Sequence, residues 1–172
     1  MPIVARASGS NFIPAPAGAH AGVCVDVVDL GTLEVTYKNQ TKKQHKIDIV
    51  WQIAEDMEDG RPFRVKKRYT LSLHEKAALR KDLESWRGRA FTDAELDGFD
   101  VETVISVPCL LNVIHNATGG NTYANVSTIM RLPKGMNPPT SRDYVRVIDR
   151  EPKEGQPEAQ WNPEITDDDI PF

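Results

Sequence analysis

The order of β-rich and helical segments constrains the fold of this 172-residue chain more than any other sequence feature. Along the second β-rich run, apolar and polar side chains alternate from Lys46 to Ile53, which is typical of a half-buried strand. Four further runs favour strands, and one strong helical segment lies between the third run and the fourth. The five runs span residues 21–37, 46–53, 63–73, 101–115 and 121–132.

The helical segment opens on a capping signal. Ser72 and Glu75 fit the capping box, in which the serine oxygen accepts from the N3 amide and the glutamate reaches back. A second such pair, Thr92 and Glu95, predicts another short helical turn, and Gly88 between them favours a left-handed stop. The apolar stripe expected to face the core consists of Leu79, Leu83 and Trp86.

These elements predict a mainly β fold. Five strands with one α-helix between strands 3 and 4 match the OB-fold, a small five-stranded Greek-key barrel. Its ligands typically bind on the face of strands 2 and 3 and on the loops that join strands 1–2 and 4–5. An SH3-like barrel and a mixed α+β sandwich stay open as alternatives.

The last forty residues differ in composition from the rest. Residues 133–172 hold five basic and nine acidic side chains, and this balance of −4 equals the net charge of the whole chain. Seven of the twelve prolines also lie there, and such a stretch cannot bury enough apolar surface to offset its ordering entropy. We therefore expect a leader at 1–18, an OB-fold domain at 19–132 and a flexible acidic tail at 133–172, with 144–148 as a candidate for local order.

Basic side chains gather in two stretches. Residues 61–68 hold five basic groups in eight positions, and residues 38–46 add four lysines. Both stretches fall where an OB-fold binds its ligand, and cations there would neutralise the phosphates of a nucleic acid. A solvated strand face without a ligand is the alternative for each stretch alone. The predicted nucleic-acid contacts are Lys38, Lys42, Lys43, Lys46, Arg64, Lys66 and Arg68.

Binding of a single strand also needs aromatic rings on which bases can stack. Tyr37 beside the loop between strands 1 and 2, and Tyr123 beside the loop between strands 4 and 5, are the preferred candidates. Trp51 and Tyr69 alternate with the aliphatic residues of their strands, so they fit either the core or the floor of the groove.

No catalytic, cofactor-binding or metal-binding pattern emerges from the residue types and their spacing. The histidines are scattered without an HExxH motif, and the acidic turn at residues 55–59 lacks the EF-hand pattern. Cys24 and Cys109 are isolated, which favours small buried hydrophobes over a disulfide framework. We expect a protein without catalysis, cofactor or metal. A nuclease accessory subunit that holds a metal through Asp56 or Asp59 is the enzyme alternative.

Targeting signals are also missing from the sequence. The N-terminal stretch has no apolar region of signal-peptide length, and no run approaches the roughly 20 apolar residues of a membrane span. We expect a cytoplasmic protein that does not bind membranes.

Two parts of the chain resemble known single-stranded DNA-binding proteins. The segment Asp167, Asp168, Asp169, Ile170, Pro171, Phe172 after a Pro-rich linker resembles the acidic tip of the bacterial family. The body resembles phage-encoded OB-fold proteins of this class through FIPAPAG, KRYTLSLHEKAALRKDLESWRGR and TYANVSTIMRLPKG, across residues 11–136. This resemblance implies binding and protection of single-stranded DNA in phage replication or recombination, in the cytoplasm of a bacterial host.

The tip has its own physical interpretation. Three carboxylates followed by apolar Ile170 and Phe172 would suit a partner with a basic rim and an apolar pocket. The resemblance implies that such partners are host or phage replication, recombination and repair proteins. Two other interpretations of the chain stay open, namely a protein-protein adaptor and an RNA-binding OB-fold protein, because 2′-hydroxyl contacts leave no local signature. Exposed strand edges leave a homo-oligomer open as well.

Overall fold

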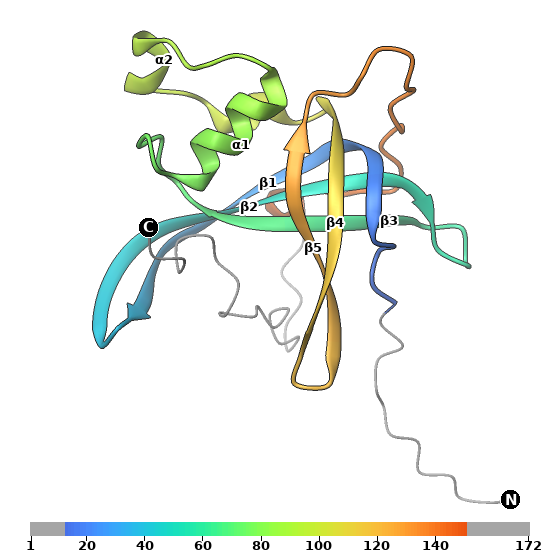
Figure 1. The fold of residues 1–172 in the computed structure, drawn as a ribbon, viewed down its shortest axis with the longest axis horizontal. Coiled ribbons are helices and arrows are strands. Elements are labelled where there is room, and N and C mark those ends of the chain that lie inside the picture. Colours follow the sequence, from blue (N-terminus) through green and yellow to red (C-terminus); the bar gives the residue numbers. More distant parts are fainter. Residues whose placement is uncertain (1–12, 151–172) are drawn as a thin grey trace, which may run out of the picture.

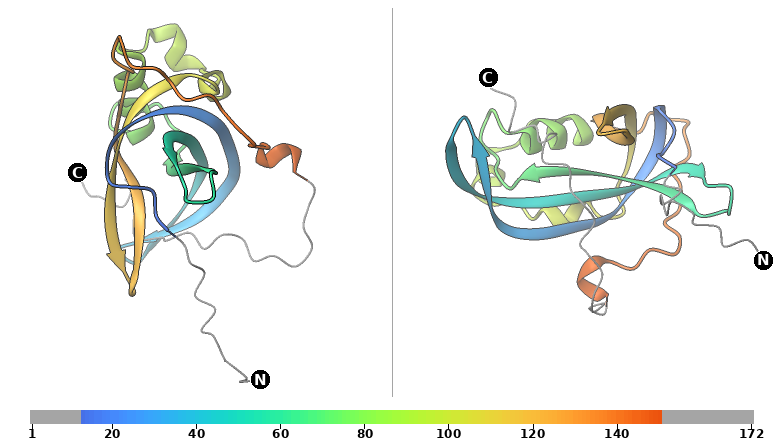
Figure 2. Two further views of the ribbon diagram at one scale, coloured as in Figure 1. Left: turned by 90° about the vertical axis from the view of Figure 1, so that its right-hand side faces the viewer. Right: turned by 90° about the horizontal axis from the view of Figure 1, so that it is seen from below.

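A strongly curved antiparallel sheet forms the body of the protein in the computed structural model, which describes residues 13–150 (Figure 1). Its hydrogen-bonded order is β3-β2-β1-β4-β5. In Figure 1 the hairpin of β4 and β5 crosses the ribbons of β1, β2 and β3, and Figure 2 shows that β1 is strongly curved along its length. The expected mainly β class with five strands is thus confirmed. The strands are β1 (Gly18–Tyr37), β2 (Gln40–Asp56), β3 (Pro62–Thr70), β4 (Pro108–Thr118) and β5 (Asn121–Met130).

Strand β1 is long enough to pair with two partners. Its first part, Gly18–Val23, pairs with β4, and most of its length from Gly22 onward pairs with β2. Two register shifts interrupt the pairing with β2, and Gly31 at the second shift has φ of +69°. Because bulges bend a strand and increase its twist, these shifts let one strand serve both halves of the sheet.

The helical region differs from the sequence prediction at its start. Helix α1 (Ala78–Arg87) begins after Ala77, which makes no side-chain cap, so the predicted capping box at Ser72 and Glu75 is wrong. The Ser72 hydroxyl instead accepts a hydrogen bond from the His74 amide at 3.2 Å, within a turn. The predicted stop is confirmed, because Gly88 lies in the left-handed region with φ of +74°.

The next two elements join the helix to the second half of the sheet. The predicted capping box of Thr92 and Glu95 is confirmed at the start of α2 (Asp93–Asp97). A 3-10 turn, η1 (Val101–Val104), then occupies the start of the run predicted as the fourth strand. That prediction is corrected to a strand beginning at Pro108, since Asp100 caps the turn and Val101 and Val104 enter the core instead.

The core lies between the concave side of the sheet and α1. The predicted apolar stripe of α1 is buried there, and the rings of Trp86 and Trp51 lie 6.0 Å apart between centroids. Helix α1 also donates from the Ser85 hydroxyl to the backbone oxygen of Ile129 in β5. The helix therefore closes one end of the curved sheet and contacts both β3 and β5.

The chain continues beyond β5 and returns to the opposite side of the sheet. We call residues 140–150 the strap; it contains the short 3-10 turn η2 (Val147–Asp149). The side chain of Gln52 in β2 donates to the Thr140 oxygen at 2.7 Å and accepts from the Arg142 amide at 3.0 Å. Within the region expected as a flexible tail, residues 140–150 are thus joined to the sheet by hydrogen bonds, and they include the predicted candidate for local order at 144–148. The predicted tip at 167–172 lies outside the described residues, as does most of the predicted leader.

Candidate nucleic-acid interface

The side of the sheet that faces away from the core carries most of the predicted site, and we call it the outer surface. On β2 and β3 it consists of cross-strand pairs, since residues opposite each other in an antiparallel pair share a face. These pairs are Gln52 with Arg64, Val50 with Lys66 and Asp48 with Arg68.

The basic residues on this part differ in their availability. Arg68 donates to both carboxylate oxygens of the buried Asp48, at 2.8 and 3.0 Å, which holds its guanidinium against the sheet. Lys66 makes a longer ion pair of 3.5 Å with the same carboxylate, and 48% of its side chain is exposed. Of these two predicted contacts, Lys66 is the one that solvent and a ligand can reach.

Lys46 does not lie on an accessible surface. It is fully buried, and its ammonium group donates to the Thr70 hydroxyl at 2.7 Å. The prediction that Lys46 contacts nucleic acid is corrected on this ground, because a buried ammonium group with a partner is not presented to a phosphate.

Trp51 and Tyr69, which by sequence fitted either the core or the floor of the groove, both belong to the core. Trp51 is 0% exposed and packs on Trp86, and Tyr69 donates its hydroxyl to Asp82 of α1 at 2.6 Å. Neither ring offers a stacking surface in this structure. Sequence reasoning also passed over Lys67, which shares the inner parity of Tyr69 and binds the same Asp82 carboxylate at 2.9 Å.

The hairpin of β1 and β2 projects beyond the core. Lys38 and Asn39 form its tip, with φ of 47° and 62°, as a two-residue turn with a primed-type twist requires. Tyr37 is 38% exposed beside the tip, with the Lys38 ammonium group 5.4 Å from its ring centre. Lys42 and Lys43 are both exposed.

Strand alternation separates these two adjacent lysines. Lys42 shares its parity along β2 with Asp48 and Gln52, so it lies on the outer surface, whereas Lys43 points to the opposite side. Tyr37 pairs with Gln40, which has the parity of Lys42, and therefore shares the outer surface. On the other half of the sheet, Tyr123 is half-buried and pairs with Asn116.

Arg64 is held by the strap. Its guanidinium donates to the Arg142 oxygen at 2.7 Å and lies 5.0 Å from the ring centre of Tyr144. Its Nε is buried without a hydrogen-bond partner among the described residues, and burial lowers the pKa of the guanidinium. Arg64 therefore joins strap to sheet, and the predicted role in nucleic-acid binding would have to be performed from beneath the strap.

A buried carboxylate anchors the strap. Asp26 of β1 is 1% exposed and accepts from the Tyr144 hydroxyl at 2.8 Å, from Arg146 Nε at 3.0 Å and from the Val147 amide at 2.9 Å. Burial alone would raise the pKa of Asp26, but these hydrogen bonds and the Arg146 charge hold it below its usual value. The only sequence signal was a carboxylate inside the apolar run around Val25.

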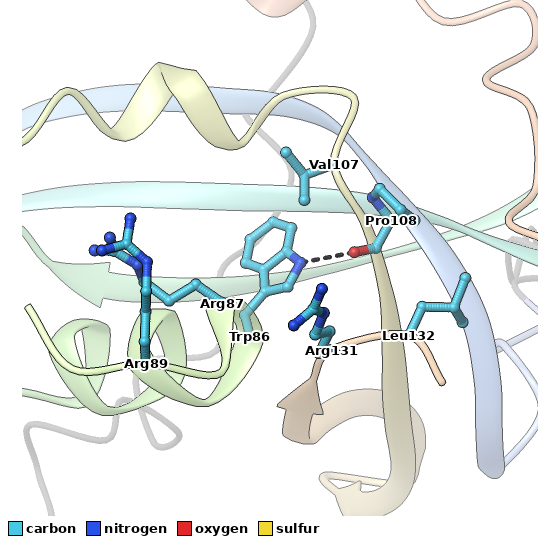
Figure 3. Close-up of a pocket in the computed structure, with 7 residues that line it drawn as sticks. All are labelled: Trp86, Arg87, Arg89, Val107, Pro108, Arg131 and Leu132. Atoms are coloured by element: carbon cyan, nitrogen blue, oxygen red, sulfur yellow. Dashed lines mark hydrogen bonds between the residues drawn. The ribbon is translucent and has the colours of Figure 1, made fainter. Parts of the chain in front are cut away.

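An arginine-lined hollow of about 420 Å³ lies at the end of α1 (Figure 3). Arg87, Arg89 and Arg131 surround an apolar floor that includes the Trp86 indole, whose nitrogen donates to the Pro108 oxygen at 2.9 Å. Glu95 pairs with Arg87 at 2.7 Å and with Arg89 at 3.6 Å, so part of this positive charge is already neutralised. Sequence reasoning did not find this hollow, because α1 and β5 meet only in the fold.

Residues 13–150 contain no group of three His, Cys, Asp or Glu side chains placed to hold a metal ion. The two cysteines are buried free thiols, as predicted, and burial raises the pKa of Cys24 to about 12. Within the same residues, no helix has the length and apolar character needed to cross a membrane.

No protein-family model matches the chain, and no curated protein matches it either.

Proposed function

We propose that this protein is an OB-fold protein that binds single-stranded DNA without sequence specificity. The sheet order β3-β2-β1-β4-β5, the helix between β3 and β4 and the contacts between β3 and β5 support a Greek-key barrel. The resemblance of the body to phage-encoded proteins supports a role in phage DNA replication or recombination.

One observation carries the proposal. The strand registers place Tyr37, Lys42 and Lys66 on the outer surface of one continuous sheet, and the exposed Lys38 lies at the tip of the same hairpin. A single strand laid along this surface would meet ammonium groups for its phosphates and an exposed ring for its bases.

A titration across salt concentrations tests this function. We expect the full chain to bind an oligo-dT more tightly than the duplex of the same length, with affinity falling as salt rises. Each neutralised phosphate contributes a slope of about −0.7 in log K against log salt for single strands. Equal affinity for single strand and duplex, or binding insensitive to salt, would reject the proposal; tighter binding of the matching RNA would reassign it to RNA.

Two neighbouring lysines provide a matched pair of variants. Lys42→Ala should weaken oligo-dT binding and reduce the salt slope by about 0.7, because Lys42 lies on the outer surface. Lys43→Ala removes the same charge from the opposite face and should change both quantities less. If both variants lost the same affinity for oligo-dT, the phosphate contacts would not be confined to the outer surface.

A further inference from the structure

The hairpin of β4 and β5 is free of formal charge. Residues 107–130 contain no Asp, Glu, Lys or Arg, although 27% of all residues in the protein are charged. The distal part of the β1–β2 hairpin instead holds Lys38, Lys42 and Lys43 against the single carboxylate of Glu34. Both hairpins project from the same body (Figure 1), yet they present different chemistry to a ligand.

The strand register separates the two faces of the β4–β5 hairpin. One face carries Val113 opposite Val126, and both side chains are buried in the core. The other face belongs to the outer surface, where Asn116 lies opposite Tyr123 and Ile114 lies opposite Asn125. Ile114 is 40% exposed. This face therefore combines side-chain amides, a tyrosine ring and an exposed aliphatic group.

One amide on this face has an unused donor. The Asn125 Nδ2 group is buried and has no hydrogen-bond partner among the described residues. At the nearby register shift, by contrast, Asn112 Nδ2 donates to the Ser127 hydroxyl at 2.8 Å. A buried donor without a partner is destabilising, and a turn of the Asn125 amide about χ2 would present it to a ligand. The ligand's acceptor would then offset that cost.

We propose that the outer face of the β4–β5 hairpin contacts the bases of the single strand, whereas Lys38, Lys42 and Lys66 contact its phosphates. This inference rests on the proposed function and assigns the base contacts of that site to one hairpin. An amide offers both a donor and an acceptor to a base edge, and Tyr123 and Ile114 offer a stacking surface. Lysines here would hold phosphates without regard to the bases, and carboxylates would repel the strand.

Oligomers with and without bases separate these two kinds of contact. The full chain would be titrated with oligo-dT, oligo-dA and an abasic deoxyribose-phosphate oligomer of equal length. We expect the abasic oligomer to bind about tenfold more weakly than oligo-dT, since it cannot stack or form hydrogen bonds with the hairpin.

Variants assign the loss to the hairpin. Asn125→Ala and Tyr123→Ala should each weaken binding of the base-bearing oligomers about fivefold, leaving the salt slope and the binding of the abasic oligomer unchanged. Tyr123→Phe, which keeps the ring, should lose less affinity for oligo-dT than Tyr123→Ala. Lys42→Ala should weaken all three oligomers by one common factor and lower the slope.

Three results would overturn the assignment, and they differ from failure of the proposed function. The first is equal affinity of the parent protein for oligo-dT and the abasic oligomer. The second is a loss for Asn125→Ala and Tyr123→Ala that extends equally to the abasic oligomer, and the third is no loss in either variant. In all three cases phosphate binding stands. If the parent protein bound none of the oligomers, the proposed function and this assignment would both fall.

Discussion

Asp26 sits in the middle of an apolar strand, and its carboxylate is almost inaccessible to water. An ionised carboxylate in such a place is stable only when hydrogen bonds and an opposite charge replace its hydration. Tyr144, Arg146 and the Val147 amide supply them, so the burial of one residue depends on three others in the strap. The same contacts raise the pKa of Tyr144, because its hydroxyl is buried and donates to the carboxylate.

Asp26 should make the stability of the protein depend on acid. Its pKa in the folded protein lies below the usual 3.8, so its contribution is fully present above about pH 4 and is lost as the pH falls through the lowered value. We expect Asp26→Asn to lower the free energy of unfolding at pH 7 by about 2 kcal/mol, and by less in acid. Urea titrations of both proteins at pH 7 and pH 3 measure this. A difference that grows in acid would contradict the sign of the shift.

The strap is the element that most alters the outer surface of the sheet. Its contacts reach β1 through Asp26 and β2 through Gln52, and the Arg142 guanidinium also pairs with Asp56. Asp26 and Gln52 are buried on the outer surface, and the strap supplies hydrogen bonds to both side chains. The folded unit therefore continues past β5 into the strap.

A double-mutant cycle measures how strongly the strap is coupled to the sheet. Asp26→Asn and Tyr144→Phe should each lower the free energy of unfolding, but the double variant should lose at least 0.5 kcal/mol less than the sum. The reason is that either change removes the same hydrogen bond. Tyr123→Phe, on the distant hairpin, is the matched control and should add to Asp26→Asn without coupling. Strict additivity of the Asp26 and Tyr144 changes would show that the strap is not held through this contact.

At the scale of the whole molecule, charge is divided between body and tail. The excess of negative charge lies in residues 133–172, and the accessible lysines of the proposed interface lie on the outer surface of the sheet and at the β1–β2 hairpin. A tail of this kind is tethered close to a basic surface and can compete with a nucleic acid for it. We therefore propose that the tip at 167–172 recruits replication and recombination proteins while restraining the affinity of the body for DNA.

Deletion of Ile170–Phe172 separates these activities. We expect oligo-dT binding to stay intact or to strengthen, because the outer surface is unchanged, while the protein no longer captures host replication proteins in pull-down experiments. Replacement of Asp167–Asp169 by Asn is the companion variant, which tests the carboxylates and keeps the apolar residues. Unchanged capture by the deletion variant would contradict the role of the tip.

Local signals predicted the elements better than the site. The glycine stop at Gly88 and the capping box at Thr92 act between residues a few positions apart, so they survive in the fold. The signal at Ser72 failed, because the residues after it form a turn before α1 starts. Among the predicted site residues, those exposed and accessible to a ligand are Lys38, Lys42, Lys43, Lys66 and Tyr37. Those buried and therefore not accessible are Lys46, Trp51 and Tyr69.

The sequence alone determined the number of strands, their order along the chain, the helix between the third and fourth, and the apolar side of β2 and β3. These properties follow from alternation and capping, which depend on neighbouring residues. Only the tertiary structure decided which basic and aromatic side chains are accessible, and that a carboxylate of β1 binds a tyrosine 118 residues away. Such pairings depend on how the sheet curves and where the chain returns, and no local pattern records either.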